Sequence, residues 1–265
     1  MDAHPPLDTA ALREQLVGPW RRLDVVEETG STNADLLARA AAGEDIDGAV
    51  LLAEHQTSGR GRHGRQWATP PRSQVALSVG VGAAAVPTTG WGWLTLATGV
   101  AVADALGQVA GIDAGLKWPN DVVVGDGKLA GILAEVAAPN PVIVIGLGLN
   151  ATMTAAEAPE HTAATSLTML GVAADRTALA AAVLRQLAAR IDGWRSAGGA
   201  DEALRADYRR YSATLGTRVR ASMPGDRQIE GIAEAIDELG RLRIDTGAGV
   251  ETVSAGDVTH LRPGV

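Results

Sequence analysis

The sequence contains a run of 31 residues, positions 73–103, in which no side chain carries a charge. A run of this length must leave water, either in a membrane or in the core of a folded protein. Glycines and one proline interrupt it at Gly80, Gly82, Pro87, Gly90 and Gly92. Such residues break a spanning helix into shorter pieces. The run therefore predicts a buried strand over 74–81, a turn and a buried helix over 91–111, and it argues against a membrane span.

Composition limits the function classes that remain. The 265 residues suffice for one large and one small domain. Aromatic residues make up only 3% of the chain and phenylalanine is absent, so the core must be packed from Leu, Val, Ile and Ala. The net charge of -8 argues against general binding of nucleic acid, because domains with that function are usually basic.

The absence of cysteine excludes several kinds of site at once. Without a thiol, the chain cannot form a disulfide, use a thiolate nucleophile or bind zinc through sulfur. The five histidines form no i, i+4 pair, so no zinc site is expected from them either. The first twenty residues show no basic segment followed by an apolar run, so no secretory signal is predicted. Together these features favour a cytoplasmic protein.

Local patterns predict both strands and helices. A strand beginning at residue 24 leads into a helix that ends at Gly43. Four further strands follow from the same patterns: one over 49–56, one over 141–150, and two over 116–136 joined by a turn at 125–127.

The C-terminal part of the chain changes character. Residues 176–211 predict two helices separated at Gly198 and Gly199. After Tyr211, short alternating stretches separated by turn residues predict a small β module. We therefore place a domain boundary near residues 212–216.

The segment TSGRGRHGRQW, residues 57–67, concentrates positive charge in a flexible loop of an acidic chain. Arg60, Arg62 and Arg65 can converge on a ligand with several anionic oxygens, because guanidinium groups bind carboxylate or phosphate through paired hydrogen bonds. Ordering seven such residues costs about 7–14 kcal/mol of backbone entropy. We therefore expect a lid that is mobile when empty and that excludes water from a reactive intermediate when closed.

Two segments resemble nucleotide-binding motifs but do not satisfy them. GRGRHG fits the dinucleotide pattern G-x-G-x-x-G, but that pattern must open a helix, and Pro70 and Pro71 prevent one here. GDGK resembles the end of a P-loop, but Val122 stands where its first glycine belongs and Leu129 where Ser or Thr belongs.

Two other stretches carry polar groups that a simple structural role does not require. In KWPNDVVVGDGKLAGI, Lys128 enters an apolar strand, where an ammonium group needs an anionic partner. Asn120 and Asp121 offer a polar cluster that could orient this lysine or a metal. In GSTN, residues 30–33, any one of Ser31, Thr32 and Asn33 can cap the following helix, which leaves the others for a ligand.

Taken together, these stretches resemble the biotin protein ligase family. The resemblance rests on five motifs in the family's order: GSTN (30–33), EHQTSGRGRHGRQW (54–67), KWPND (117–121), KLAGIL (128–133) and GLGLN (146–150). It covers roughly residues 20–262. It implies an α+β fold, with a mixed β-sheet and flanking helices like those of class II aminoacyl-tRNA synthetases, followed by a small SH3-like β-barrel. The implied division is a leader (1–20), a catalytic domain (21–213) and a C-terminal domain (214–265).

The resemblance also implies a reaction in two steps. The carboxylate of biotin would attack the α-phosphate of ATP, supplied with Mg²⁺, giving biotinyl-5′-AMP and pyrophosphate. The amine of one lysine on a biotin-carboxyl-carrier domain of an acyl-CoA carboxylase would then attack that mixed anhydride and release AMP. Arranging cations between a carboxylate and a triphosphate is what such a reaction requires.

The resemblance assigns roles to thirteen residues. The implied biotin-binding residues are Ser31, Thr32, Asn33, Gln56, Arg60, Gly61, Arg62, Lys128 and Gly131. The implied ATP-binding residues are Arg62, Arg65, Trp67, Lys128 and Asn150, and the implied catalytic residues are Lys128, Arg62 and Asp121. No spacing of carboxylates identifies ligands for the metal.

The sequence departs from the family pattern in two places. Some members carry an N-terminal DNA-binding domain, whereas only about twenty residues precede the first motif region here, so a ligase without specific DNA binding is expected. His63 stands at a position that is often basic in the family, which softens the charge of the loop.

Two other functions fit the sequence less well. A lipoate or octanoate ligase or transferase would share the catalytic fold but would carry an Arg-Arg/Ser-Gly-Gly-Gly signature, which is absent here. A non-enzymatic module that contacts phosphates through the Gly/Arg loop would leave Lys128 and the GSTN cluster unexplained.

Overall fold

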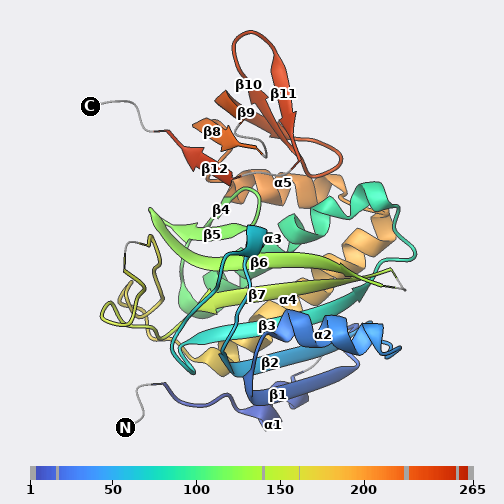
Figure 1. Ribbon diagram of the computed structural model, residues 1–265, viewed down its shortest axis with the longest axis vertical. Helices are drawn as coiled ribbons and strands as arrows, with labels where there is room; N and C mark the ends of the chain where they lie inside the picture. Colours follow the sequence, from blue (N-terminus) through green and yellow to red (C-terminus); the bar gives the residue numbers. More distant parts are fainter. Residues whose placement is uncertain are drawn as a thin grey trace.

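The computed structural model describes residues 4–15, 18–138, 141–160, 162–223, 227–254 and 257–261. Its larger sheet has the strand order β1-β2-β3-β7-β6-β5-β4, in which β1 and β2 are parallel and all other neighbours are antiparallel (Figure 1). The strands are β1 (Arg22–Thr29), β2 (Ala49–Gln56), β3 (Gln74–Gly82), β4 (Gly115–Lys117), β5 (Asp121–Val124), β6 (Gly127–Ala137) and β7 (Val142–Asn150). The mixed sheet that the resemblance implied is thus confirmed.

Helices lie on both faces of this sheet. They are α1 (Thr9–Glu14), α2 (Thr32–Ala41), α3 (Gly92–Ala110), α4 (Arg176–Ala197) and α5 (Glu202–Tyr211), with 3₁₀ turns η1 (Arg62–Gly64) and η2 (Thr88–Gly90). α2 packs on one face through a small core that includes Leu36, Leu51 and Val144. α3 and α4 pack together on the other face, over a larger core of β3, β6 and β7 side chains. The two helices predicted on either side of Gly198 and Gly199 are confirmed as α4 and α5.

The uncharged run forms β3 and α3, as the sequence predicted. The segment Thr88–Ala110 is long and apolar enough to span a membrane by length and composition alone. In the structure most of its residues are instead covered by the sheet, α4 and α5. α3 ends at Gly111, whose φ of 64° is left-handed and favours glycine. An all-round apolar helix of this kind is a core helix of a layered domain.

One predicted element was wrong in detail. Residues 116–124 were expected to form a single strand, but the chain breaks between β4 and β5 at Trp118, Pro119 and Asn120. Pro119 has no N–H to give to a sheet. The side-chain amide of Asn120 instead donates to the carbonyl of Ile132 at 2.9 Å, and the N–H of Ile132 donates to the carbonyl of Asn120 at 2.9 Å. The break thus forms a tight connection within the KWPND motif, between Lys117 and Asp121, which pair across it.

The C-terminal strands form a second, antiparallel sheet. Its order is β11-β10-β9-β8-β12, with strands β8 (Arg218–Ser222), β9 (Gln228–Ile236), β10 (Leu242–Asp245), β11 (Val250–Val253) and β12 (Asp257–His260). Two buried tryptophans of the larger domain hold it in place: Trp93 donates its indole N–H to the carbonyl of Asp237 at 3.1 Å, and Trp118 donates to Gly240 at 3.0 Å. The C-terminal sheet therefore sits against α3 and the KWPND motif (Figure 1).

Candidate active site

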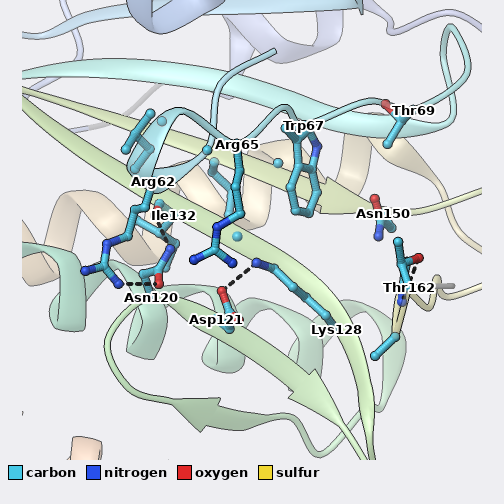
Figure 2. A pocket seen from close by; sticks show the side chains of 18 of the residues that line it. Arg62, Arg65, Trp67, Thr69, Asn120, Asp121, Lys128, Ile132, Asn150 and Thr162 are labelled. Atoms are coloured by element: carbon cyan, nitrogen blue, oxygen red, sulfur yellow. Dashed lines mark hydrogen bonds and ion pairs between the residues drawn. The ribbon is translucent and has the colours of Figure 1, made fainter. Parts of the chain in front are cut away.

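A cavity of about 700 Å³ opens on the α2 face of the larger sheet. All thirteen residues that the sequence singled out line this cavity: Ser31, Thr32, Asn33, Gln56, Arg60, Gly61, Arg62, Arg65, Trp67, Asp121, Lys128, Gly131 and Asn150. Figure 2 shows that Arg65 and Lys128 point their charged ends toward one space, with Arg62 directed toward Asn120 on one side of it and Trp67 and Asn150 on the other. Five motifs spread over 121 positions of the sequence, 30–150, therefore form one site.

Strand β7 explains why GLGLN forms the floor. Side chains alternate along a strand, so Leu147 and Leu149 enter the core while Gly146, Gly148 and Asn150 face the cavity. A Cβ on Gly146 would lie 2.2 Å from Oδ1 of Asn33, and one on Gly148 would lie 2.5 Å from Nε1 of Trp67. Glycine is therefore required at both positions, because polar side chains pack directly on the backbone.

A β-bulge in β6 turns Lys128 into the cavity. Val122 pairs with Ala130 but its neighbour Val123 pairs with Lys128, which leaves Leu129 as an extra residue. In a regular strand Lys128 would point to the same side as Ala130, which is buried in the core. The extra residue reverses the alternation at this point, as bulges near functional sites do. The ammonium group therefore faces the cavity.

Asp121 is the anionic partner that Lys128 required. Its Oδ1 lies 2.6 Å from Nζ of Lys128 (Figure 2). The same Nζ lies 5.3 Å from the centre of the Trp67 ring, within the range of a cation–π contact. Gly131, the cross-strand neighbour of Asp121, leaves room for these groups, since a Cβ there would lie 3.1 Å from the Trp67 ring. The lysine is thus held on two sides.

At one end of the cavity, the GSTN motif forms a buried polar network. Ser31 is the helix cap, accepting from the N–H of Ala34. Thr32 donates both its backbone N–H (2.9 Å) and its hydroxyl (3.1 Å) to Oε1 of Gln56. The hydroxyl of Ser78 on β3 contacts that of Thr32 at 2.7 Å and donates to Oδ1 of Asn33 at 2.6 Å. This end is therefore built before any ligand arrives.

Glu135 connects that network to the Gly/Arg loop. Its Oε2 accepts from the amide of Asn33 at 2.9 Å, and its Oε1 accepts from Nη2 of Arg60 at 2.8 Å. Glu135 is not among the site residues expected from the sequence, although it follows KLAGIL on the strand. Side chains alternate along a strand, so Glu135 shares a face with Gly131 and Leu133, which line the cavity. This alternation could have identified Glu135 from the sequence.

The remaining loop arginines contact other elements. Nη1 of Arg62 donates to Oδ1 of Asn120 at 3.3 Å, and Arg65 forms an ion pair with Asp257 of β12. Burial lowers the pKa of Arg62 from its ordinary value, while the charge of Asp257 raises it. A guanidinium group nevertheless keeps its charge at any physiological pH. Arg62 and Arg65 thus line the same cavity as Lys128 while each is held by a different element.

The other end of the cavity carries an aromatic ring and a free acceptor. Trp67 donates its indole N–H to Oε1 of Gln74 at 2.6 Å, which fixes the ring. Asn150 is 2% exposed and donates Nδ2 to the carbonyl of Thr165 at 2.9 Å. Its Oδ1 has no hydrogen-bond partner within the described residues. A buried acceptor of this kind calls for a donor from a ligand.

Several lining residues were missed because they come from distant segments. Asp257, Thr259 and His260 reach the cavity from β12, and the backbone of Lys128 exchanges hydrogen bonds with Ala163 and Thr165. Burial, together with the charge of Lys117, lowers the pKa of His260. No local pattern marks these contacts. Among the described residues, no group of three His, Cys, Asp or Glu side chains could hold a metal ion.

Comparisons with known proteins define the class. The model of the Biotin/lipoate A/B protein ligase family matches residues 27–150, and that of the Biotin protein ligase C terminal domain matches 214–261. A biotin--[acetyl-CoA-carboxylase] ligase of Mycobacterium tuberculosis is 56% identical over 97% of both chains. The chain belongs to the biotin protein ligase family, as the motifs predicted.

Other relatives agree with this assignment. The bifunctional ligase/repressor BirA of Escherichia coli is 32% identical over 86% of this chain and 71% of its own length. The biotin protein ligase of Aquifex aeolicus, solved in complex with biotin and ATP, has a TM-score of 0.78 at 25% identity, over 92% of this chain and all of that one. The Leishmania major ligase, solved with biotinyl-5-AMP, has a TM-score of 0.60 at 26% identity, over 88% of this chain and 99% of that one.

Proposed function

We propose that this protein attaches biotin to a lysine of a biotin-carboxyl-carrier domain, using ATP and passing through biotinyl-5′-AMP. The observation that carries the proposal is the order of groups along one cavity: a preformed polar end, three cations, and an end with an indole ring and an unpaired amide oxygen. This order matches a ligand with a polar ring, a carboxylate-phosphate centre and a nucleobase.

At the polar end, the proposed ligand is the ureido ring of biotin. That ring presents two N–H donors and one carbonyl acceptor, which suits the hydroxyls and amides of Ser31, Thr32, Asn33 and Gln56. Arg60 and Gly61 would follow the valeryl chain toward its carboxylate. Because Thr32 and Asn33 are nearly buried, they lose little freedom on binding.

At the centre, the cations would allow two anions to meet. A carboxylate oxygen of biotin forms a bond to the α-phosphorus, and the bond to the β-phosphate oxygen breaks, releasing pyrophosphate. Lys128 and Arg62 would stabilise the charge on the phosphorus oxygens, with Asp121 holding Lys128 in position. In the second step, the acceptor amine attacks the acyl carbon, loses a proton and displaces AMP.

At the far end, the proposed ligand is the adenine nucleotide. Trp67 would pack near the base, Oδ1 of Asn150 would accept from an amino group, and Arg65 would contact phosphate. Magnesium would enter with ATP, held mainly by phosphate oxygens, since Mg²⁺ commonly needs only one or two carboxylates from the protein. Asp126 also lines the cavity and is the candidate carboxylate. The ion would neutralise part of the triphosphate charge.

The test is biotin-dependent exchange of pyrophosphate into ATP, followed by detection of biotinyl-5′-AMP by mass spectrometry. Lipoate is the matched control, because the family model covers ligases for biotin and for lipoate. Exchange with biotin but not with lipoate is expected. Exchange with lipoate alone, or none, would overturn the proposal. An added carrier domain should then acquire biotin on one lysine. A cytoplasmic location and the lack of specific DNA binding stay predictions.

A further inference from the structure

The Gly/Arg loop is fastened to three different elements by its three arginines. Arg60 binds Glu135 on β6, and Arg62 binds Asn120 between β4 and β5. Both partners belong to the larger sheet domain. Arg65 binds Asp257, which belongs to the C-terminal sheet. One of the three fastenings therefore depends on a second domain.

The position of Asp257 is fixed by how that domain docks. The turn between β9 and β10 accepts hydrogen bonds from two buried indoles, as described above. Gly92 at the start of α3 touches this turn so closely that a Cβ would lie 2.2 Å from the carbonyl of Leu239. On the other side, β12 pairs with β8 throughout, from Asp257 to His260. The docked sheet thus holds a carboxylate at the edge of the cavity.

The charges around Asp257 all belong to the loop. Burial alone would raise the pKa of Asp257, but its hydrogen bond to Arg65 and the charges of Arg65, His63 and Arg62 hold that pKa below the ordinary value. The carboxylate is therefore ionised at neutral pH and attracts the whole cationic segment. Inside the loop, the N–H of Gly61 donates to the carbonyl of Arg65 at 2.7 Å. The position of Arg65 is therefore coupled to that of the residues at the start of the loop.

We propose that Asp257 is a positioning residue with which the C-terminal domain holds the Gly/Arg loop closed over the acyl-adenylate. It acts through Arg65 and not on the reacting atoms. The inference rests on the proposed function for its chemical readout only. It gives the C-terminal domain a role in holding the loop, which could not be inferred from the motifs or from the catalytic residues.

The test compares Asp257→Ala, Asp257→Glu and Glu251→Ala with the parent enzyme. Glu251 is the matched control, because it lies on the same sheet, pairs with Arg227 at 3.0 Å and has a side chain 46% exposed, against 54% for Asp257. Each enzyme is loaded with biotin and MgATP without carrier. Escape of the adenylate is then measured as biotinylation of serum albumin. The chain's own lysines compete little, because Lys117 and Lys128 are its only two and both line the cavity.

Asp257→Ala should raise the escape rate by up to about fivefold, the factor that corresponds to roughly 1 kcal/mol for an exposed ion pair. Asp257→Glu should restore it toward the parent value, and Glu251→Ala should leave it unchanged. An Asp257→Ala rate equal to that of the parent, or no rescue by Glu, would overturn the proposal. Equal acceleration by Glu251→Ala would also overturn it, because the cause would then be a loosened sheet.

A second readout does not depend on biotin chemistry. Limited proteolysis of the empty enzymes should cut residues 59–66 faster in Asp257→Ala than in Glu251→Ala or the parent. Biotin with ATP should protect this segment in the parent. Equal cutting in all three empty enzymes contradicts the proposed role of Asp257, even if adenylation proceeds. If the parent forms no adenylate but the cutting differs, the proposed function fails, whereas the proposed role of Asp257 in holding the loop is supported.

Discussion

The two walls of the cavity hold their polar groups in opposite ways. On the α2 side, Ser31, Thr32 and Asn33 are 3–4% exposed, and Thr32 and Asn33 are fixed by short hydrogen bonds to neighbouring strands. On the loop side, the side chains of Arg60 and Arg65 are 47% and 59% exposed and are held by ion pairs at the surface. Buried networks are rigid, whereas exposed ion pairs contribute about 0–1 kcal/mol each.

This difference corresponds to two tasks. The buried wall can recognise a neutral ring of fixed shape, which needs no movement. The loop wall must neutralise charge that changes during the reaction, and it must open to admit ATP and an acceptor lysine. Weak fastenings at several points allow such opening, because each can break separately. The following variants test this division, starting with the group between the walls.

Lys128→Ala should have the largest effect, because this ammonium group lies between the two walls, where the carboxylate and the phosphate are proposed to meet. We expect biotin-dependent pyrophosphate exchange to fall by about 10²–10³-fold, the loss typical when one preorganised donor to a charged transition state is removed. The circular dichroism spectrum should stay that of the parent. Near-normal turnover would contradict the assignment.

Two glycine substitutions should affect the two ends of the cavity separately. Gly146→Ala places a Cβ against Asn33, and Gly148→Ala places one against Trp67. Overpacking costs roughly 1–3 kcal/mol, so the affinity of the crowded end should fall by about tenfold to a hundredfold. Calorimetry should show the loss for biotin with Gly146→Ala and for ATP with Gly148→Ala. Each variant is the control for the other, and equal losses for both ligands would refute the division.

Arg62→Ala should have an effect of similar size on the loop side. A hydrogen bond to a charged group contributes about 1.5–3 kcal/mol, so biotin and the adenylate should bind about tenfold more weakly or worse. Arg220→Ala, which removes a surface pair with Glu230 on the C-terminal sheet, is the matched control. Calorimetric affinity for biotin equal to that of the parent would show that Arg62 faces no ligand carboxylate.

The smallest effect concerns the segment after Asn150. Hydrogen bonds from the backbone N–H of Thr154, from His4 and from the Thr154 hydroxyl lower the pKa of Glu157 from 4.5 to about 2. Because this pKa is depressed on folding, its stabilisation is present above pH 4.5 and is lost as pH falls toward 2. Glu157→Gln should therefore lower the melting temperature slightly at pH 6 and not at pH 2, with Glu160→Gln as control. A difference that does not change with pH would be inconsistent with this cause.

Much of this arrangement could be predicted from the sequence, because the motifs are local and their strands are regular. The polar residues Gln74 and Ser78 show what was available but unused: they stand four apart in the apolar stretch QVALSVGV, hence on one face, and both bind site residues. Asp257 could not be found in this way, since its place depends on how two domains dock. Nor could the break at Pro119 be separated from a continued strand by hydrophobic pattern alone.

The extra residue at Leu129 means that the backbone pairing of β6 determines the site as much as the identity of its residues does. A protein engineer who built β6 with regular pairing, Leu129 opposite Val123, would keep Lys128 in the sequence, yet its ammonium group would turn toward the apolar core side of the sheet. Transplanting this site into another scaffold therefore requires copying an irregularity of backbone pairing, which a sequence alignment does not display.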